Sequence, residues 1–535
     1  MERDGFDRLT IWNLLQDAAS RHEDKEIVYR KERRTFREFR DRVQSFAAGL
    51  QHIVGVKKGD VVACLDWDTM RYLEAYYAVP SAGGVLHTVN IRYPPELIYY
   101  TMSHASDSFV IIRDEFVPMI EKFKDMFSFV KGWIVYSDDG AGIETSLKPL
   151  YRYEEVLTSG NELEPNQDEN SRATIFYTSG TTGMPKGVTF TQRQIVLHSL
   201  AVQIAVTLPP LNITTQDVAM PLVPMFHVHT WGLPFSSLVG GMKYVLPGRY
   251  DFQKIPEIID TEGVTLTASV PSILYMLLNS PTIMQHSGAL GKLKALIGGA
   301  SLPTGLARKA EELGITVVGA YGLSETCPAL TISNYNDRAL MLPEEKRREL
   351  RYRAGVPFPF VSLRVVNEDF KDVPKDGKSV GEIVVRAPWL TEGYYRDEAK
   401  TAELWKGGWL HTGDLGVIDE YGYLLIVDRE KDAVKSGGEF IPSLIVESAI
   451  SEMKGIGEVA IIGVSSEQWG ERPVAVATCA AQIEEKDVIN HLNKYVEMGR
   501  IQKWWIPDRV IFVDAIPKTS TGKADKKKLK EMVKL

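Results

Sequence analysis

The chain has 535 residues, too many for one hydrophobic core, and its 44% hydrophobic and 25% charged residues are ordinary values for a globular protein. The formal net charge of −8 argues against general nucleic-acid binding, which requires a basic face. The three cysteines, Cys64, Cys327 and Cys479, form no CxxC pair, so neither a disulfide framework nor a structural zinc site is expected. A reducing, cytoplasmic location is expected instead.

The N-terminal part alternates helical and strand-like patterns. Residues 10–55 are amphipathic and helical, with a strand-like interruption at 26–29. An apolar run at 61–65 (VVACL) predicts a buried parallel strand, a helical stretch covers 69–80, and a further apolar run covers 109–112. This spacing predicts βαβ units and therefore an α/β fold. The opening residues lack the apolar core of a secretory signal, and no apolar run is long enough to span a membrane.

A polar connector at 158–172 precedes a second alternating part, which continues to about residue 330. Within it, 263–270 (GVTLTASV) and 294–299 (KALIGG) each end in turn residues that expose the carboxyl end of a strand. Ligands bind at that edge in open α/β sheets. We therefore expect a ligand site here.

The pattern changes after residue 350. The segments 361–367, 381–387 and 421–429 are β-rich, and a stretch with clustered charges and glycines follows at 429–440. Beyond it, strands at 458–464, 473–480 and 509–513 and a helix at 486–498 predict a small α+β unit. We place a hinge at Lys431, which divides the chain into residues 1–428, a hinge at 429–432, and residues 433–535.

Residues 177–187 read YTSGTTGMPKG, a polar loop between the apolar stretches TIFY and VTF. Glycines let backbone N–H groups turn toward one centre, hydroxyls donate to phosphate oxygens, and a lysine supplies a positive charge. The loop therefore predicts a polyphosphate site, although it is not the GxxxxGK[ST] P-loop. A flexible surface turn is the alternative, which the flanking apolar stretches disfavour. The residues assigned to the phosphate site are Thr178, Ser179, Gly180, Thr181, Thr182, Gly183 and Lys186.

The string TSGTTGMPKG resembles the signature loop of the adenylate-forming superfamily, which contains acyl-CoA synthetases, luciferases and the adenylation domains of peptide synthetases. Further motifs follow in the family's order, so the resemblance covers essentially the whole chain. It implies a large N-terminal domain of doubly wound sheets with a β-barrel-like subdomain, and a small, mobile α+β C-terminal domain. A homodimer is left open.

The motif AYGLSET (320–326) looks like the family's aromatic-Gly-x-Ser/Thr-Glu motif. The resemblance implies that Tyr321 stacks on adenine and that Glu325, with Thr178, holds Mg²⁺, a cation that prefers oxygen ligands. Alone, Ser324 and Glu325 would equally suit the start of a helix. IGGASLP (297–303) resembles the strand end that leaves room for the base. The residues assigned to this side of the nucleotide are Gly299, Ala300, Ser301, Tyr321, Gly322 and Ser324.

Three later motifs complete the nucleotide site that the resemblance implies. WLHTGDLG (409–416) carries Asp414, which accepts the ribose hydroxyls, although an aspartate in a β-turn is the plainer interpretation of TGD alone. DREKD (428–432) carries Arg429, a second ribose contact, and the hinge residue Lys431. KSGGEF (435–440) resembles the stretch that swings in for a second half-reaction. Its assigned residues are Lys435, Gly437 and Gly438.

The last two motifs concern catalysis and the acid. PKTSTGKADKKKLK (517–530) looks like the family's terminal motif, whose catalytic lysine is Lys523, while the other lysines fit a solvated helix face. VPMFHVHTWG (223–232) resembles the acid-side segment, in which His227 lines the acid pocket and Trp231 gates an acyl tunnel. A core tryptophan is the alternative for Trp231. His227 and His229 lack nearby carboxylates and do not predict a metal pair.

Together these motifs imply an AMP-forming acyl-CoA synthetase that uses ATP, Mg²⁺ and CoA and acts on a carboxylic acid. The motifs resemble most those of synthetases for medium- to long-chain fatty acids. The alternatives are a CoA ligase for a short hydroxy or thioether acid, a stand-alone adenylating enzyme that loads a carrier protein, and a luciferase-like oxygenase. A non-catalytic nucleotide-binding protein is disfavoured, because Lys523, Glu325 and the loop hydroxyls are all retained.

Overall fold

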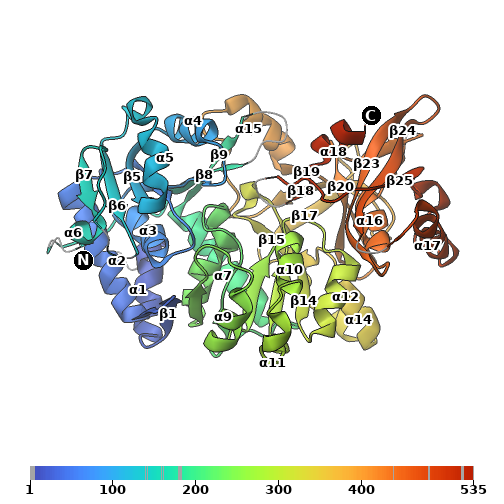
Figure 1. Cartoon of the computed structure of the whole chain (residues 1–535), viewed down its shortest axis with the longest axis horizontal. Helices are drawn as coiled ribbons and strands as arrows, with labels where there is room; N and C mark the ends of the chain where they lie inside the picture. The colour runs from blue at the N-terminus through green and yellow to red at the C-terminus, as the bar shows by residue number, and fades with distance from the viewer. Residues whose placement is uncertain are drawn as a thin grey trace.

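The computed structural model describes residues 7–138, 140, 142–157, 160, 162–178, 184–437, 439–479, 482–519 and 523–533. Its described strands form four sheets. The chain starts in the blue N-terminal part at the left of Figure 1 and ends in the orange and red part at the right. The two largest sheets belong to the N-terminal part.

A seven-stranded sheet contains the first predicted strands. Its central strands are parallel, and only the edge strand β9 is antiparallel to its neighbour β8. The predicted strand at 61–65 is confirmed as β3, and the predicted run at 109–112 lies inside β5. In sheet order the strands are β7 (Leu150–Arg152), β6 (Gly132–Tyr136), β5 (Asp107–Arg113), β3 (Val61–Leu65), β4 (Val85–Thr88), β8 (Arg172–Thr178) and β9 (Lys186–Thr191).

A nine-stranded sheet lies beside it. Strand β1 confirms the predicted strand-like interruption at 26–29, and it joins this sheet by pairing in parallel with β11, which is far away in sequence. Strand β2, which was not predicted, follows β1 in a β-hairpin. In sheet order the strands are β16 (Val356–Pro357), β15 (Ala329–Ile332), β14 (Thr316–Gly322), β13 (Lys294–Ile297), β12 (Leu266–Ser269), β10 (Val218–Ala219), β11 (Lys243–Leu246), β1 (Glu26–Tyr29) and β2 (Glu32–Thr35).

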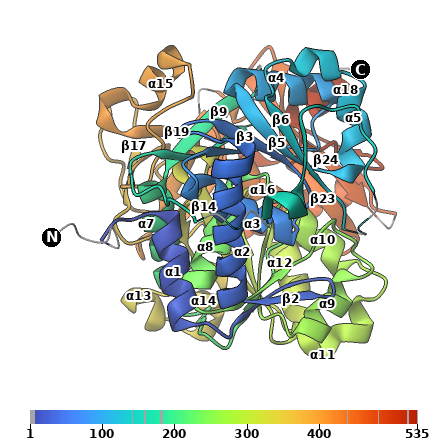
Figure 2. The same ribbon diagram turned by 90° about the vertical axis from the view of Figure 1, so that its left-hand side faces the viewer.

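Helices cover both faces of each large sheet. Along β3, Val62 and Cys64 enter the central core, whereas Ala63 and Leu65 enter an outer core, as the alternation of side chains along a strand requires. The central core is filled by α1 (Ile11–Arg21), α2 (Phe36–Gly49), α3 (Met70–Ser81), α7 (Gln192–Thr207) and α8 (Leu233–Val239). Figure 2 looks onto α1 and α2, with β3, β5 and β6 above them. This is the expected doubly wound arrangement.

The outer faces are covered by further helices. On the nine-stranded sheet these are α9 (Ile255–Glu262), α10 (Pro271–Leu278), α11 (Ser287–Leu290) and α12 (Thr304–Glu312). On the seven-stranded sheet they are α4 (Pro95–Ala105) and α5 (Val117–Glu121). The remaining helices are α6 (Tyr153–Leu157), α13 (Asp337–Leu340), α14 (Glu344–Leu350) and α15 (Glu398–Leu404). None of the helices among the described residues is both long and apolar enough to cross a membrane.

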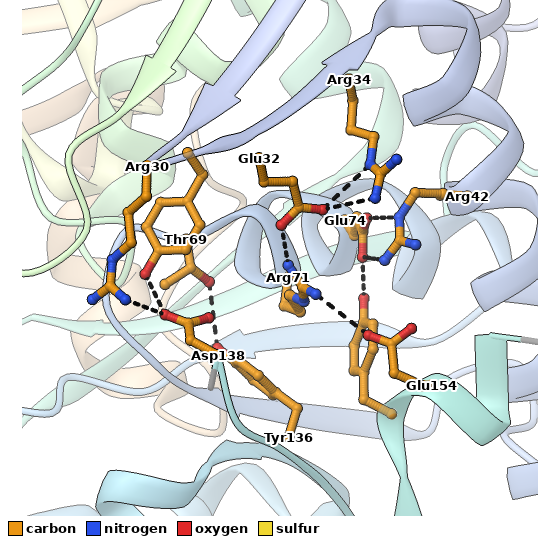
Figure 3. Close-up of polar contacts among 12 residues, drawn as sticks. Arg30, Glu32, Arg34, Arg42, Thr69, Arg71, Glu74, Tyr136, Asp138 and Glu154 are labelled. Atoms are coloured by element: carbon orange, nitrogen blue, oxygen red, sulfur yellow. Dashed lines mark hydrogen bonds and ion pairs between the residues drawn. The ribbon is translucent and has the colours of Figure 1, made fainter. Parts of the chain in front are cut away.

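A polar network ties the two large sheets together (Figure 3). Tyr29, at the end of β1, donates a hydrogen bond of 2.6 Å to Asp138, which follows β6, and Arg30 lies 3.3 Å from the same carboxylate. Nearby, the buried Glu74 of α3 accepts hydrogen bonds from Arg42 of α2 at 2.5 Å and from Tyr153 at 2.6 Å. Since the two sheets contribute different parts of the site below, these contacts fix the parts relative to each other.

The expected β-rich subdomain is a four-stranded antiparallel sheet. The three predicted β-rich segments are confirmed as β17 (Ser362–Val366), β18 (Gly381–Arg386) and β20 (Leu424–Arg429). The fourth strand is β19 (Leu410–Ile418), which contains the TGD sequence. The β-turn interpretation of Asp414 is therefore wrong, because this residue lies within a strand and is paired with Arg429.

The residues from 434 to 533 form a small α+β unit, called here the C-terminal unit. It was expected, but its β-hairpin and its first helix were not. Helices α16 and α17 pack on one face of its sheet and α18 on the other. Its elements are β21 (Val434–Ser436), β22 (Glu439–Ile441), α16 (Ser443–Ser451), β23 (Ile456–Ser466), β24 (Gly470–Cys479), α17 (Glu485–Glu497), β25 (Arg509–Phe512) and α18 (Lys526–Val533).

Candidate active site

A cavity of about 1990 Å³ lies where the two large sheets, the four-stranded sheet and the C-terminal unit meet. Strands β8 and β14 end at it, as ligand sites in α/β sheets do. Motif residues that are far apart in sequence line it together: Thr178, Lys186, Glu325, Asp414 and Lys523. The structure thus brings the separate motifs to one place.

The phosphate side of the cavity is the hairpin between β8 and β9. Thr178 ends β8 and pairs directly with Lys186, the first residue of β9. The predicted loop residues Ser179, Gly180, Thr181, Thr182 and Gly183 lie outside the described residues. The two described ends of this segment, Thr178 and Lys186, both line the cavity.

Tyr394 connects the phosphate side to Glu325. The Nζ of Lys186 lies 4.4 Å from the centroid of the Tyr394 ring, a cation–π distance. The Tyr394 hydroxyl donates a hydrogen bond of 2.7 Å to Oε1 of Glu325. Burial, followed by the nearby Lys400, lowers the pKa of Lys186 below its usual value. One tyrosine therefore contacts both a cation and a carboxylate on the predicted phosphate side.

Sequence reasoning missed Tyr394. The residue is held at the edge of β9 by a bridge to Val188, and the next residue, Tyr395, donates its backbone N–H to the carbonyl of Gly187 at 2.8 Å. These partners are distant in sequence, and no local pattern indicates the pairing. The only available signal was the paired aromatic residues in GYY at 393–395.

A buried carboxylate, Asp414, lies on the predicted ribose side of the cavity. It accepts a hydrogen bond of 2.9 Å from the hydroxyl of Tyr321, and Nε of Arg429 lies 3.5 Å from its other oxygen. Burial raises the pKa of Asp414, and the guanidinium of Arg429 opposes this. Tyr321, Asp414 and Arg429 thus form one cluster, in which a diol can bind to the carboxylate.

Small residues border the adenine side. Gly299, Ala300, Ser301 and Ser324 line the cavity. Gly299 has a φ of +74°, in the region that favours glycine. At Gly322, an added Cβ would lie 1.9 Å from the carbonyl oxygen of Pro328, so no larger residue fits this strand end.

Lys523 enters the cavity from the C-terminal unit. It lies in the turn before α18, where its carbonyl accepts a hydrogen bond of 2.8 Å from the backbone N–H of Thr519. Its Cε lies 3.9 Å from the position that a Cβ on Gly299 would occupy. Burial and then Arg429 lower the pKa of Lys523 to about 8, although Asp414 and Glu325 act in the opposite direction. The lysine is therefore surrounded by the nucleotide-site residues.

Trp231, predicted to gate the acid side, is not among the residues that line the cavity. It is 8% exposed, and its Cη2 lies 3.3 Å from the position that a Cβ on Gly298 would occupy. It is thus a core residue and also a neighbour of the Gly298–Gly299 strand end that Lys523 reaches. His227 lines the cavity, and burial, then Lys523, lowers its pKa to about 3, so its ring is neutral at neutral pH.

Trp231 is carried by a left-handed turn. Val228, His229, Thr230 and Trp231 have φ values of 25°, 55°, 49° and 59°, which is strained for residues with side chains. The ring of His229 anchors the turn, with Nε2 2.7 Å from Oγ1 of Thr174 and Nδ1 3.7 Å from Sγ of Cys327. His229 is therefore a structural histidine of the core.

The remaining predicted residues lie on or beyond the hinge. Lys431 lines the cavity, and burial lowers its pKa. Lys435 and Gly437 are exposed on the β21–β22 hairpin, outside the residues that line the cavity. Gly437 has a φ of +61° and donates its N–H to the carbonyl of Trp469 at 2.8 Å. Gly438 lies outside the described residues.

The donor set of the cavity fits Mg²⁺ that arrives with a nucleotide. In the described part of the chain, no three or more His, Cys, Asp or Glu side chains form a cluster that could hold a metal ion alone. Mg²⁺, however, is commonly bound by one or two carboxylates together with substrate phosphates and water. Glu325 supplies such a carboxylate, and Thr178 lines the cavity with it.

Comparisons with known proteins agree with this geometry. A model of the AMP-binding enzyme family matches residues 15–395, and one of the AMP-binding enzyme C-terminal domain matches residues 445–523. The long-chain-fatty-acid–CoA ligase of Thermus thermophilus is 37% identical, covering 99% of this chain and 96% of the relative. The 3-methylmercaptopropionyl-CoA ligase of Ruegeria lacuscaerulensis is 36% identical, covering 98% and 97%. The crystal structure of ATP-bound MatB from Rhodopseudomonas palustris has a TM-score of 0.82 at 27% identity, covering 98% and 99%.

Proposed function

Because the chain belongs to the AMP-binding enzyme family and is an AMP-forming acyl-CoA synthetase, we propose that its cavity activates a medium- to long-chain fatty acid. The similarity to fatty-acid–CoA ligases supports the chain length. The observation that carries the activation step is the position of Lys523, which enters the cavity from the C-terminal unit and is influenced electrostatically by Asp414 and Arg429. A lysine at that place can neutralise charge where the acid and the nucleotide meet.

In the first half-reaction, a carboxylate oxygen of the acid attacks the α-phosphorus of ATP, and the bond to the leaving pyrophosphate breaks. Lys523 donates to the acid carboxylate and an α-phosphate oxygen, while Asp414 and Arg429 hold the ribose. The 178–186 loop and Lys186 hold the pyrophosphate. When bound at Glu325 and Thr178, Mg²⁺ neutralises phosphate charge. Catalysis at this stage is mainly positioning and charge neutralisation.

In the second half-reaction, the C-terminal unit turns about Lys431, with 1–428 as the fixed domain and 433–535 as the moving one. Lys523 leaves the cavity, and the hairpin with Gly437 and Gly438 enters. The CoA sulfur then bonds to the acyl carbon, the bond from that carbon to the AMP oxygen breaks, and the thiol proton passes to solvent. This rotation lets one cavity serve two reactions and protects the activated acid from water.

A short hydroxy or thioether acid is the second candidate substrate. The buried position of Trp231 beside Gly298 and Gly299 favours it, because an indole in that place shortens the space for an acyl chain. The similarity to the 3-methylmercaptopropionyl-CoA ligase points in the same direction. The similarity to fatty-acid ligases of long and medium chain supports the first candidate.

Pyrophosphate release decides between the candidates. It is measured with ATP and Mg²⁺, with and without CoA, over straight-chain acids from acetate to palmitate and over short hydroxy and thioether acids. A maximum at medium or long chains with CoA-dependent turnover supports the first candidate. A maximum at short substituted acids supports the second. Release that ignores CoA would instead indicate another acceptor, such as a carrier protein.

We further propose that the enzyme is a cytoplasmic homodimer. All three cysteines are free, two of them buried and one exposed, which suits a reducing compartment. Dimerisation rests on the family resemblance, and light scattering tests it directly, since a monomer has a mass of 59.9 kDa.

The pH dependence of adenylation should follow Lys523. Burial lowers its pKa to about 8, and only the protonated lysine can donate to two anionic oxygens. At low ATP, kcat/KM for adenylation is therefore expected to be constant below about pH 7, to reach half of that value near pH 8, and to fall about tenfold per pH unit well above it. The Lys523→Ala variant should lack this decline. If the decline persists in that variant, another group causes it.

A further inference from the structure

A buried carboxylate of the four-stranded sheet contacts side chains of the C-terminal unit. Asp428, the residue before Arg429 on β20, is only 3% exposed. Nζ of Lys526, the first residue of α18, lies 3.6 Å from Oδ2 of Asp428. The hydroxyl of Ser443, the first residue of α16, donates a hydrogen bond to the same oxygen. Asp428 is thus a contact point between the two parts of the chain.

Lys526 also has partners within its own unit. Its Nζ lies 3.2 Å from Oε1 of Glu447 and donates a hydrogen bond of 3.0 Å to the hydroxyl of Ser443. Glu447 in turn accepts the backbone N–H of Ile461 at 2.7 Å. Lys526, Glu447 and Ser443 therefore form a connected cluster that belongs wholly to the C-terminal unit.

We propose that Asp428 and Lys526 are positioning residues for adenylation, because their contact holds the C-terminal unit in the arrangement that places Lys523 in the cavity. This inference rests on the proposed function and on the hinge at Lys431. Asp428 precedes that hinge, whereas Lys526, Glu447 and Ser443 follow it. Rotation therefore carries the three later residues away together and breaks only their contacts with Asp428.

The position of Lys526 explains why this contact acts on Lys523. Lys523 lies in the turn before α18, and Lys526 is the first residue of that helix. Anchoring the start of α18 to Asp428 fixes how far the turn reaches into the cavity. Asp428 is also the direct neighbour of Arg429, which pairs with Asp414. The end of β20 therefore positions both the proposed ribose site and Lys523.

The contact is suited to be broken and remade. When the C-terminal unit departs, Lys526 keeps Glu447, so no charge is left unpaired in that unit, and Asp428 becomes accessible to water. In the docked state both charges are shielded from solvent, where ion pairs are stronger than on a surface. The contact therefore stabilises the arrangement with Lys523 in the cavity and opposes the rotated arrangement only weakly.

The test separates the two half-reactions. Asp428→Asn removes the charge and leaves Lys526 paired with Glu447, so folding is expected to persist. Pyrophosphate release without CoA is expected to fall about 10- to 100-fold, the range given by a population shift of one to two orders of magnitude. Thioester formation from synthetic acyl-adenylate and CoA should stay unchanged or increase. Equal loss in both half-reactions would overturn the proposal.

A second set of variants tests the pairing itself. Lys526→Met should reduce adenylation like Asp428→Asn, and the double variant should be no worse than either single one, because both remove the same contact. Lys526→Arg should recover part of the loss. Additive losses would contradict the proposal. The matched control is Lys494→Met, which removes an exposed lysine of α17 that does not line the cavity and should leave pyrophosphate release unchanged.

A distance measurement provides a readout independent of activity. Cys479 is the exposed cysteine of the C-terminal unit, and Cys64 and Cys327 are buried. Met341 lies in the N-terminal part of the chain and is 86% exposed. Two dyes, one on Cys479 and one on the cysteine introduced by Met341→Cys, report the rotation by energy transfer. Asp428→Asn should shift the distribution away from that of the parent protein. An unshifted distribution refutes this inference but leaves the proposed function standing, whereas absence of acid-dependent pyrophosphate release in the parent refutes the proposed function itself.

Discussion

Replacing Lys523 with alanine is expected to lower adenylation by at least about 100-fold, the scale for losing one preorganised charge-stabilising donor. The lysine reaches Gly299 and lies in the electrostatic field of Asp414, Glu325 and Arg429. Single-turnover pyrophosphate release measures the effect.

The second half-reaction distinguishes this role from a general structural one. In the proposed mechanism Lys523 leaves the cavity before the thiol attacks, so thioester formation from preformed acyl-adenylate should be largely spared in Lys523→Ala. Lys523→Arg keeps the charge but not the shape of the ammonium group, and an intermediate rate is expected. Equal damage to both half-reactions would contradict the assignment of Lys523 to the first arrangement.

Glu325→Gln is expected to reduce adenylation by about 100-fold, because it removes the carboxylate charge that faces the phosphates and keeps the shape. The hydroxyl of Tyr394 donates to Oε1 at 2.7 Å, and the amide oxygen of a glutamine can still accept that hydrogen bond. The fold should therefore persist. A raised Mg²⁺ requirement, measured by titrating pyrophosphate release against Mg²⁺, would assign the loss to metal binding.

Tyr394→Phe is the matched control for Glu325. It keeps the carboxylate and the aromatic ring beneath Lys186, which lies 4.4 Å from the ring centroid, but removes the hydroxyl. Since only one hydrogen bond to a charged group is lost, adenylation should fall less, by about tenfold. If both variants lose activity equally without any change in Mg²⁺ requirement, Glu325 acts through Tyr394 and not through the metal.

The sequence identified most of the strands and the motif residues around the cavity. Apolar runs such as 61–65 are strands because a segment buried on both faces must be apolar throughout. The glycine and hydroxyl string at 178–187 indicated phosphate binding because few other functions need that combination. Asp414 and Lys523 were found through the family resemblance, since a single aspartate or lysine carries no local signal.

Tertiary structure alone decided which distant residues meet. Strand β1 pairs with β11, Tyr394 bridges Lys186 and Glu325, and Asp428 receives Lys526. Each of these contacts depends on how sheets and domains pack, and hydrophobic periodicity records only which face of a segment is buried. The same limit applies to Trp231, whose ring packs beside Gly298. The sequence by itself therefore determined which residue types carry the proposed chemistry, whereas packing decided which of them meet at one cavity and that Asp428 contacts Lys526, because both arise between segments that no local pattern connects.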